Sequence, residues 1–150
     1  MKGNHKAPQN TISKSNLLCA EGKPDLDLVW KTIQDEARQI SSSEHRLTAL
    51  IEDIFISRNS IACSVAARLS RKLAREDMTR DELLPLLEEI LVDHPELVSS
   101  MVSDLIAINE RDPACHSLTQ PLLYYKGFLA LATYRLGHRM WKNNRHDLAY

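Results

Sequence analysis

Apolar residues recur at helical spacing through most of this 150-residue chain, from about residue 25 to residue 141. Such a repeat, every third or fourth residue, places the apolar side chains on one face of an α-helix. The clearest cases are Val29, Ile33, Ala37 and Ile40, then Ile61, Val65, Leu69 and Leu73. The chain has only four glycines, which disfavours a β-sandwich, a barrel or a glycine-rich phosphate loop. We therefore predict an all-α fold, a multi-helix bundle of six to eight helices over residues 25–150.

Residues 1–24 lack this period and are rich in Gly, Asn, Ser, Pro and Lys. Because such a segment buries too little apolar surface to offset its ordering entropy, we predict a disordered N-terminal tail. Lys2, Lys6 and Lys14 precede the short apolar stretch 17–20, which is too short for a signal-peptide core.

Capping residues divide the periodic region into helices. Asp25 is expected to cap the first helix, and Ser42 or Ser43 the second, in which Leu47, Leu50, Ile51, Ile54 and Phe55 are buried. A third helix follows Asn59–Ser60, and Thr79 with Glu82 forms a capping box for the fourth.

In the second half of the chain, prolines mark where helices begin, bend and end. Pro85 predicts a local kink in the fourth helix, and Pro95 opens the fifth, which ends at Arg111–Pro113. After a connector at 114–120, we predict one long helix from Pro121 to at least Trp141. Two glycines lie inside this helix, where a glycine often marks a close contact with another helix.

The charge and the cysteine content indicate which classes of partner the chain can bind and in which cell compartment it resides. The net charge is −1 with both signs interspersed, so we expect no nucleic-acid partner. The basic residues Arg68, Arg71, Lys72 and Arg75 are interpreted as a solvated helix face. No apolar run reaches the ~18 residues of a membrane span, so no membrane partner is expected. Three scattered cysteines indicate reduced thiols in a cytoplasmic protein.

The residues offer no convincing catalytic or metal site. The six histidines include no pair at i, i+3 or i, i+4, so no metal ligands are predicted. The neighbours His146 and Asp147 do not face each other on a helix, and Cys115 and His116 are equally poor partners. We interpret His138 as a packed histidine hydrogen-bonded to a neighbouring helix. No catalytic residue is therefore assigned within this chain.

Several motifs resemble one known family. They are Glu110–Ala114 (ERDPA), Tyr125–Leu131 (YKGFLAL), Tyr134–His138 (YRLGH) and Trp141–Lys142. In this order they are similar to the N-terminal helical domain of bacterial serine O-acetyltransferases, and the resemblance extends over residues 28–150. The chain departs from the family pattern in the link 115–120 and at His94, where an aspartate cap is usual.

The resemblance implies transfer of an acetyl group from acetyl-CoA, the co-substrate, to the hydroxyl of L-serine, a step of cysteine biosynthesis. It implies a helical domain followed by a left-handed β-helix of hexapeptide repeats, which carries the catalytic His/Asp pair and binds the coenzyme. It further implies homo-oligomers joined through the helical domains. Asp112, the aspartate of the RDP motif, is the expected serine-binding residue. From local chemistry alone, Asp112 is interpreted as a helix-ending Asp-Pro turn residue.

No hexapeptide repeat is present, so we expect a truncated chain that lacks the β-helix, binds no cofactor and is inactive alone. Because the missing part should have covered apolar surface on the last helix, we expect self-association. The alternative is a non-catalytic helical self-association or regulatory module.

Overall fold

The computed structural model describes residues 17–19 and 22–150 and confirms the all-α fold. Within these residues eight α-helices form, and the only β-type pairing is an isolated bridge between Leu18 and Pro24. The helices are α1 (Leu26–Ser43), α2 (Thr48–Ile51), α3 (Ile61–Leu73), α4 (Arg80–Asp93), α5 (Pro95–Arg111), α6 (Thr119–Tyr124), α7 (Lys126–Lys142) and α8 (His146–Ala149).

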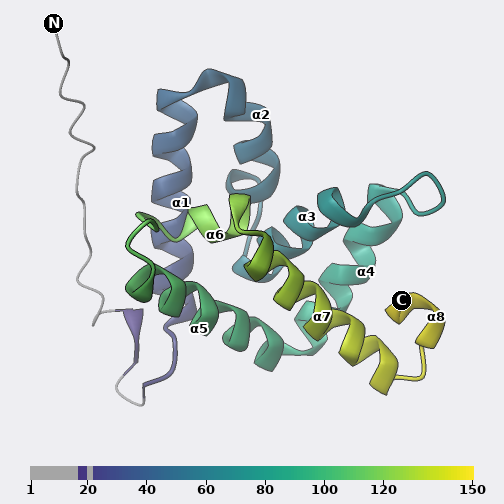
Figure 1. The fold of residues 1–150 in the computed structure, drawn as a ribbon. Coiled ribbons are helices and arrows are strands. Elements are labelled where there is room, and N and C mark those ends of the chain that lie inside the picture. Colours follow the sequence, from purple (N-terminus) through teal and green to yellow (C-terminus); the bar gives the residue numbers. More distant parts are fainter. Residues whose placement is uncertain (1–16, 20–21) are drawn as a thin grey trace, which may run out of the picture.

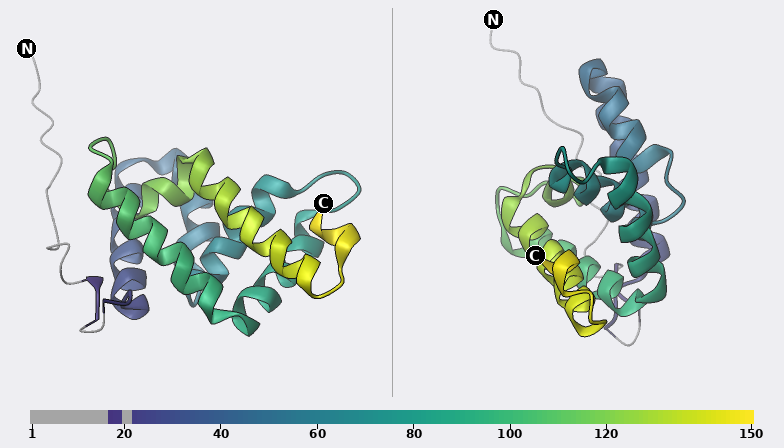
Figure 2. Two further views of the ribbon diagram at one scale, coloured as in Figure 1. Left: turned by 60° about the horizontal axis from the view of Figure 1, so that its bottom comes forward. Right: turned by 90° about the vertical axis from the view of Figure 1, so that its right-hand side faces the viewer.

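The helices pack mainly in pairs (Figure 1). α1 and α2 form a hairpin whose tip projects beyond the other helices in Figure 1 and in the right-hand view of Figure 2. α3 packs extensively against α4, α5 runs beside α7, and the short α8 folds back onto α7. This arrangement brings the end of α5 next to the start of α7, although the two are separated in the sequence.

One hydrophobic core joins all the long helices. Most of the predicted face of the first and of the third helix is buried: Val29, Ile33 and Ala37 are fully inaccessible, and Ile61, Val65 and Leu69 nearly so. The last residue of each face, Ile40 or Leu73, is only half-buried. None of the helices in the described part of the chain has the length and apolarity needed to cross a bilayer.

The predicted caps are confirmed at α1 and α4, and the structure adds Ser60 as the cap of α3, where only a break at Asn59–Ser60 was predicted. The Asp25 carboxylate accepts the Leu28 amide at 3.0 Å, the Ser60 hydroxyl accepts the Cys63 amide at 3.2 Å, and Thr79 and Glu82 form the capping box.

The predicted serine cap of the second helix is wrong. The hydroxyls of Ser42 and Ser43 donate to the carbonyls of Arg38 and Ile40, which keeps both serines inside α1. Glu44 instead accepts an amide hydrogen bond at the following turn, 3.1 Å from the Arg46 nitrogen.

The second helix is also less regular than expected. α2 is a single turn that continues as a π-helical turn over Glu52–Ile56. Ile51, Ile54 and Phe55 are fully buried, as predicted, whereas Leu47 and Leu50 are only half-buried. The Arg58 guanidinium accounts for the wider turn, because it donates to the Asp53 carbonyl at 2.7 Å and to the Asp53 carboxylate at 2.9 Å.

The single long helix predicted from Pro121 to Trp141 is wrong, because the chain breaks at Tyr125 into α6 and α7. The cause is Arg68, which donates to the carbonyls of Leu122, at 3.0 Å, and Leu123. In a continuous helix these carbonyls would accept amides from the next turn. Arg68 is only 8% exposed, so its assignment to a solvated face was also wrong.

Part of the predicted tail is structured. Leu17 is 4% exposed, and its carbonyl accepts the Asp25 amide at 2.9 Å. Residues 1–16 and 20–21, which include Lys2, Lys6 and Lys14, lie outside the described residues.

Candidate functional site

Asp112 lies where α5 ends and the connection to α6 begins. Its amide still donates to the Ile108 carbonyl at 2.9 Å, but its φ and ψ of −90° and 110° are extended. Its Oδ1 accepts the Ala114 amide at 2.9 Å, and its carbonyl accepts the Cys115 amide at 3.0 Å. These bonds hold the carboxylate, which is half-buried, at a fixed turn.

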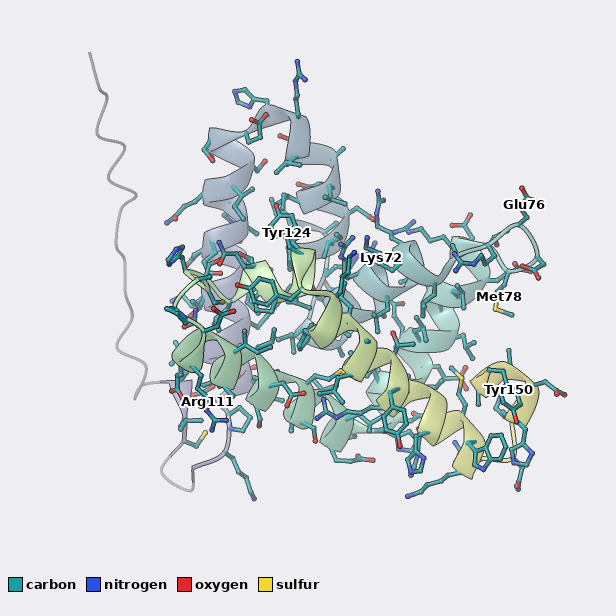
Figure 3. All side chains as sticks on the ribbon, in the orientation of Figure 1. Lys72, Glu76, Met78, Arg111, Tyr124 and Tyr150 are labelled. Atoms are coloured by element: carbon teal, nitrogen blue, oxygen red, sulfur yellow. The ribbon has the colours of Figure 1, made fainter. Side chains whose placement is uncertain are left out.

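A groove of about 490 Å³ opens beside Asp112, between the second half of α5 and the start of α7. Arg111 and Asp112 come from the end of α5, and Figure 3 shows Arg111 on the opposite side of the molecule from Tyr150. The groove is lined by Asp104, Ala107, Ile108, Arg111, Asp112, Tyr125, Gly127, Phe128 and Leu131. Its wall is thus mainly apolar, with charged groups at a few points.

Tyr125 reaches the groove from the break between α6 and α7. The Cys115 thiol and the Asp112 carboxylate lie close enough to influence the ionisation of its hydroxyl. Burial, the Cys115 thiol and the Asp112 carboxylate together raise the pKa of the Tyr125 phenol, because all three disfavour a phenolate. The tyrosine therefore keeps its proton at neutral pH.

Asp104 and Arg111 differ in their surroundings, although both line the groove. Asp104 forms an ion pair with Arg135 of α7, so α5 and α7 are joined at this point. Arg111 is exposed in the last turn of α5, where a cation is favoured by the helix dipole.

Glu36 of α1, which was not predicted to be a functional residue, fixes the far end of the connection that follows Asp112. Its two carboxylate oxygens accept the amides of Leu118 and Thr119 at 3.1 and 2.9 Å, so it caps α6. Burial raises the pKa of Glu36 above its usual value, and the two amide bonds offset this only in part.

The sequence does contain a feature that could have indicated the structural roles of Glu36 and Arg68. Each lies three residues after a buried apolar residue, Ile33 or Val65, and so at the edge of a buried helix face. A charged residue at such an edge has neighbours from other helices within reach.

The remaining sequence candidates do not join the groove. His146 and Asp147 are exposed, and His146 packs on Trp141 with ring centroids 4.2 Å apart. His138 is exposed and stacks on Tyr134, so the prediction of a packed histidine was wrong. Cys115 is buried, whereas His116 is exposed. Across residues 17–19 and 22–150, no three His, Cys, Asp or Glu side chains gather as metal ligands would.

Comparison with known proteins gives one family throughout. The family model described as "Serine acetyltransferase, N-terminal" matches residues 29–133. The serine acetyltransferase of Salmonella typhimurium is 34% identical over 83% of this chain and 46% of its own length. Probable serine acetyltransferase 4 of Oryza sativa is 38% identical over 92% of this chain and 44% of its own.

A solved structure agrees with these sequence matches. Serine acetyltransferase of Neisseria gonorrhoeae, in complex with serine, superposes with a TM-score of 0.80 at 33% identity. The match covers 81% of this chain and 51% of the Neisseria chain. This chain thus spans about half the length of the relatives it matches. The match of helices, motifs and sequence leads to one conclusion, that the chain belongs to the serine acetyltransferase family and corresponds to its N-terminal helical domain.

Proposed function

We propose that this chain is the helical part of a serine O-acetyltransferase and that Asp112 binds the ammonium group of L-serine in the α5–α7 groove. The observation that supports the proposal is the position of Asp112. Its carboxylate is held at a fixed turn beside an open groove, where it offers a charge-assisted hydrogen bond to an ammonium ion. The groove belongs to the segment that matches the family model.

We assign a binding role to the groove and no proton-transfer role. Acyl transfer to a hydroxyl requires a general base poised near neutral pH, most often histidine. The residues lining the groove include two aspartates, an arginine and a tyrosine, but no imidazole. We therefore propose that the general base and the acetyl-CoA site of the complete enzyme come from the part that the relatives have beyond this segment. The 150-residue chain alone should be inactive.

The serine-binding role is tested in a fusion enzyme in which this chain replaces the matching segment of the Salmonella relative. Asp112→Asn keeps the shape of the side chain and removes its charge. It should raise the KM for serine about 10- to 100-fold, the loss expected for a charge-assisted hydrogen bond. The KM for acetyl-CoA should remain within about twofold, because the coenzyme does not contact Asp112 in this proposal.

Asp93→Asn is the matched control, because Asp93 is an exposed aspartate at the end of α4. It should leave both Michaelis constants unchanged. If the KM for serine is unchanged in the Asp112→Asn enzyme, the proposed binding role is contradicted and Asp112 is only a turn residue.

The proposed inactivity of the chain has its own assay. Purified chain is incubated with acetyl-CoA and serine, and release of the CoA thiol is followed. Turnover proportional to the concentration of the chain would contradict the proposal.

Self-association is a second proposed role, supported by large apolar side chains exposed along α7. Leu131, Tyr134 and Trp141 are 42%, 66% and 44% exposed. Apolar side chains grouped on one face often mark an interaction surface. Light scattering at micromolar concentration should give a mass above that of a 17.1 kDa monomer. A monomer at all concentrations tested would exclude this role.

A further inference from the structure

The connection from Asp112 to α6 is bound to α1 at its far end. Both carboxylate oxygens of Glu36 accept amides there, from Leu118 at 3.1 Å and from Thr119 at 2.9 Å. Leu118 is 2% exposed and Thr119 is fully buried, so water has limited access to these bonds. α6 also packs against α1 (Figure 1). The start of α6 is therefore held by α1 and not only by its neighbours in the sequence.

Cys115 connects this fixed point to the turn at Asp112. Its thiol donates to the Ser117 carbonyl, with an S···O distance of 3.3 Å, and its amide donates to the Asp112 carbonyl at 3.0 Å. The sulfur also accepts from the side-chain amide of Asn109 in α5, at 3.7 Å. Ser117 directly precedes the first amide that Glu36 binds. A continuous series of hydrogen bonds and short chain segments thus joins Glu36 to the turn.

We propose that Glu36 is a positioning residue for serine, which fixes the connection after α5 so that the Asp112 carboxylate keeps its place beside the groove. This inference rests on the proposed serine-binding role of Asp112. Only residues 113–117 lie between Asp112 and the first amide that Glu36 binds, so a shift at the start of α6 reaches the turn through a short segment. The Ala114 amide, which holds Asp112 Oδ1 at 2.9 Å, belongs to this segment.

The position of the carboxylate matters because a binding group contributes most when it is already in place. A carboxylate fixed before the substrate arrives loses less entropy when it binds the ammonium group. A displacement of about 1 Å, by contrast, can weaken a substrate contact severely. Loosening the start of α6 should therefore weaken serine binding even though Glu36 does not touch the substrate.

The structural link is tested in the 150-residue chain by amide hydrogen exchange, followed by NMR. Glu36→Gln keeps the size of the side chain, but its NH2 group cannot accept, so at most one of the two amides keeps its acceptor. The amides of Ala114 and Cys115 should exchange about 10-fold faster, beyond any increase at the Leu69 amide of α3, which reports global stability. An increase no larger than that of Leu69 would overturn the inference.

The functional role is tested in the fusion enzyme described above. Glu36→Gln should raise the KM for serine about 3- to 10-fold and leave the KM for acetyl-CoA unchanged. Loss of stability alone lowers the amount of active enzyme, and so the apparent kcat, but it does not change KM. Glu44→Gln is the matched control, because Glu44 also caps a helical turn but binds only the exposed Arg46 amide. Its KM for serine should equal that of the unmodified fusion.

Cys115→Ala tests the same link without changing Glu36. It removes the bond from the thiol to the Ser117 carbonyl, so the turn at Asp112 loses a connection to α6. The KM for serine should rise about 2- to 5-fold, whereas the control Cys63→Ala in α3 should leave it unchanged. This variant decides the question if circular dichroism shows that the Glu36→Gln enzyme does not fold. An unchanged serine KM in the folded Cys115→Ala enzyme would overturn the inference.

A double variant separates positioning from direct binding. If Glu36 acts through Asp112, Asp112→Asn with Glu36→Gln should be no worse than Asp112→Asn alone. Fully additive losses would contradict a positioning role. A serine KM raised by Asp112→Asn but not by Glu36→Gln would overturn this inference alone, whereas a KM unchanged in both variants would overturn the proposed function as well.

Discussion

The two ends of α6 and the groove between α5 and α7 use charged side chains in opposite ways. At α6, both Glu36 oxygens are bound by backbone amides, and Arg68 donates to two backbone carbonyls. In the groove, the Asp112 carboxylate accepts one backbone amide, that of Ala114. A charged side chain whose hydrogen bonds all go to the backbone stabilises the fold. A carboxylate that can still accept hydrogen bonds beside an open groove is suited to binding a ligand.

The largest effect expected from this comparison is loss of stability in Arg68→Ala. The change removes two hydrogen bonds from a buried guanidinium and leaves the carbonyls of Leu122 and Leu123 without this partner. We expect a decrease of about 3 kcal/mol in the free energy of unfolding, measured by urea denaturation. The control is Arg71→Ala, which removes a more exposed ion pair with Asp53 and should cost less than about 1 kcal/mol. Equal losses of stability in Arg68→Ala and Arg71→Ala would contradict the distinction between side chains bonded to the backbone and exposed ion pairs.

Glu36→Ala should come second, with a loss of about 2 kcal/mol, because the amides of Leu118 and Thr119 lose their acceptor at the start of α6. Glu44→Ala, which removes one exposed cap, is the control and should cost about 1 kcal/mol or less. A smaller loss for Glu36 than for Glu44 would show that water replaces the carboxylate easily.

The pH dependence of stability gives a second test of the structural role of Glu36. Its folded-state pKa is raised, so its contribution to stability is fully present below the ordinary value of about 4.3 and is lost as the pH rises through the folded-state value. The unmodified chain should therefore lose stability relative to Glu36→Gln as the pH is increased over this interval. Denaturation curves recorded at several pH values measure the difference, and an increase with pH would contradict it.

Asp112→Asn should change the free energy of unfolding by less than about 0.5 kcal/mol, because the amide oxygen of asparagine can still accept the Ala114 amide. This small stability effect should accompany the large change in serine KM predicted for the fusion enzyme. A stability loss as large as that of Glu36→Ala would place Asp112 with the structural charges.

Gly127→Ala should be the only one of these changes that stabilises the chain, with a gain of up to about 1 kcal/mol from higher helix propensity. A Cβ at Gly127 would meet no atom within 4 Å, whereas one at Gly137 would lie 3.2 Å from the Ala149 carbonyl oxygen. Gly137→Ala is therefore the control and should bring no gain, as expected for a glycine at a close helix contact. Thermal unfolding of both variants measures this difference in stability.

The sequence by itself determined where most helices lie and which faces they bury. Capping at Asp25 and Thr79, the break at Asn59–Ser60 and the apolar spacing in α1 and α3 are local properties, so they could be predicted correctly. The motif around Asp112 also pointed to the correct family.

Only the tertiary structure decided the break at Tyr125, the burial of Arg68 and the cap at α6. Each depends on a side chain that is distant in the sequence: Arg68 lies 54 residues before Leu122, and Glu36 lies 82 residues before Leu118. Helical periodicity indicates which side of a helix is buried but not which backbone groups another helix brings there. The energy of these charged contacts favoured a broken helix over the continuous one that local propensity predicts.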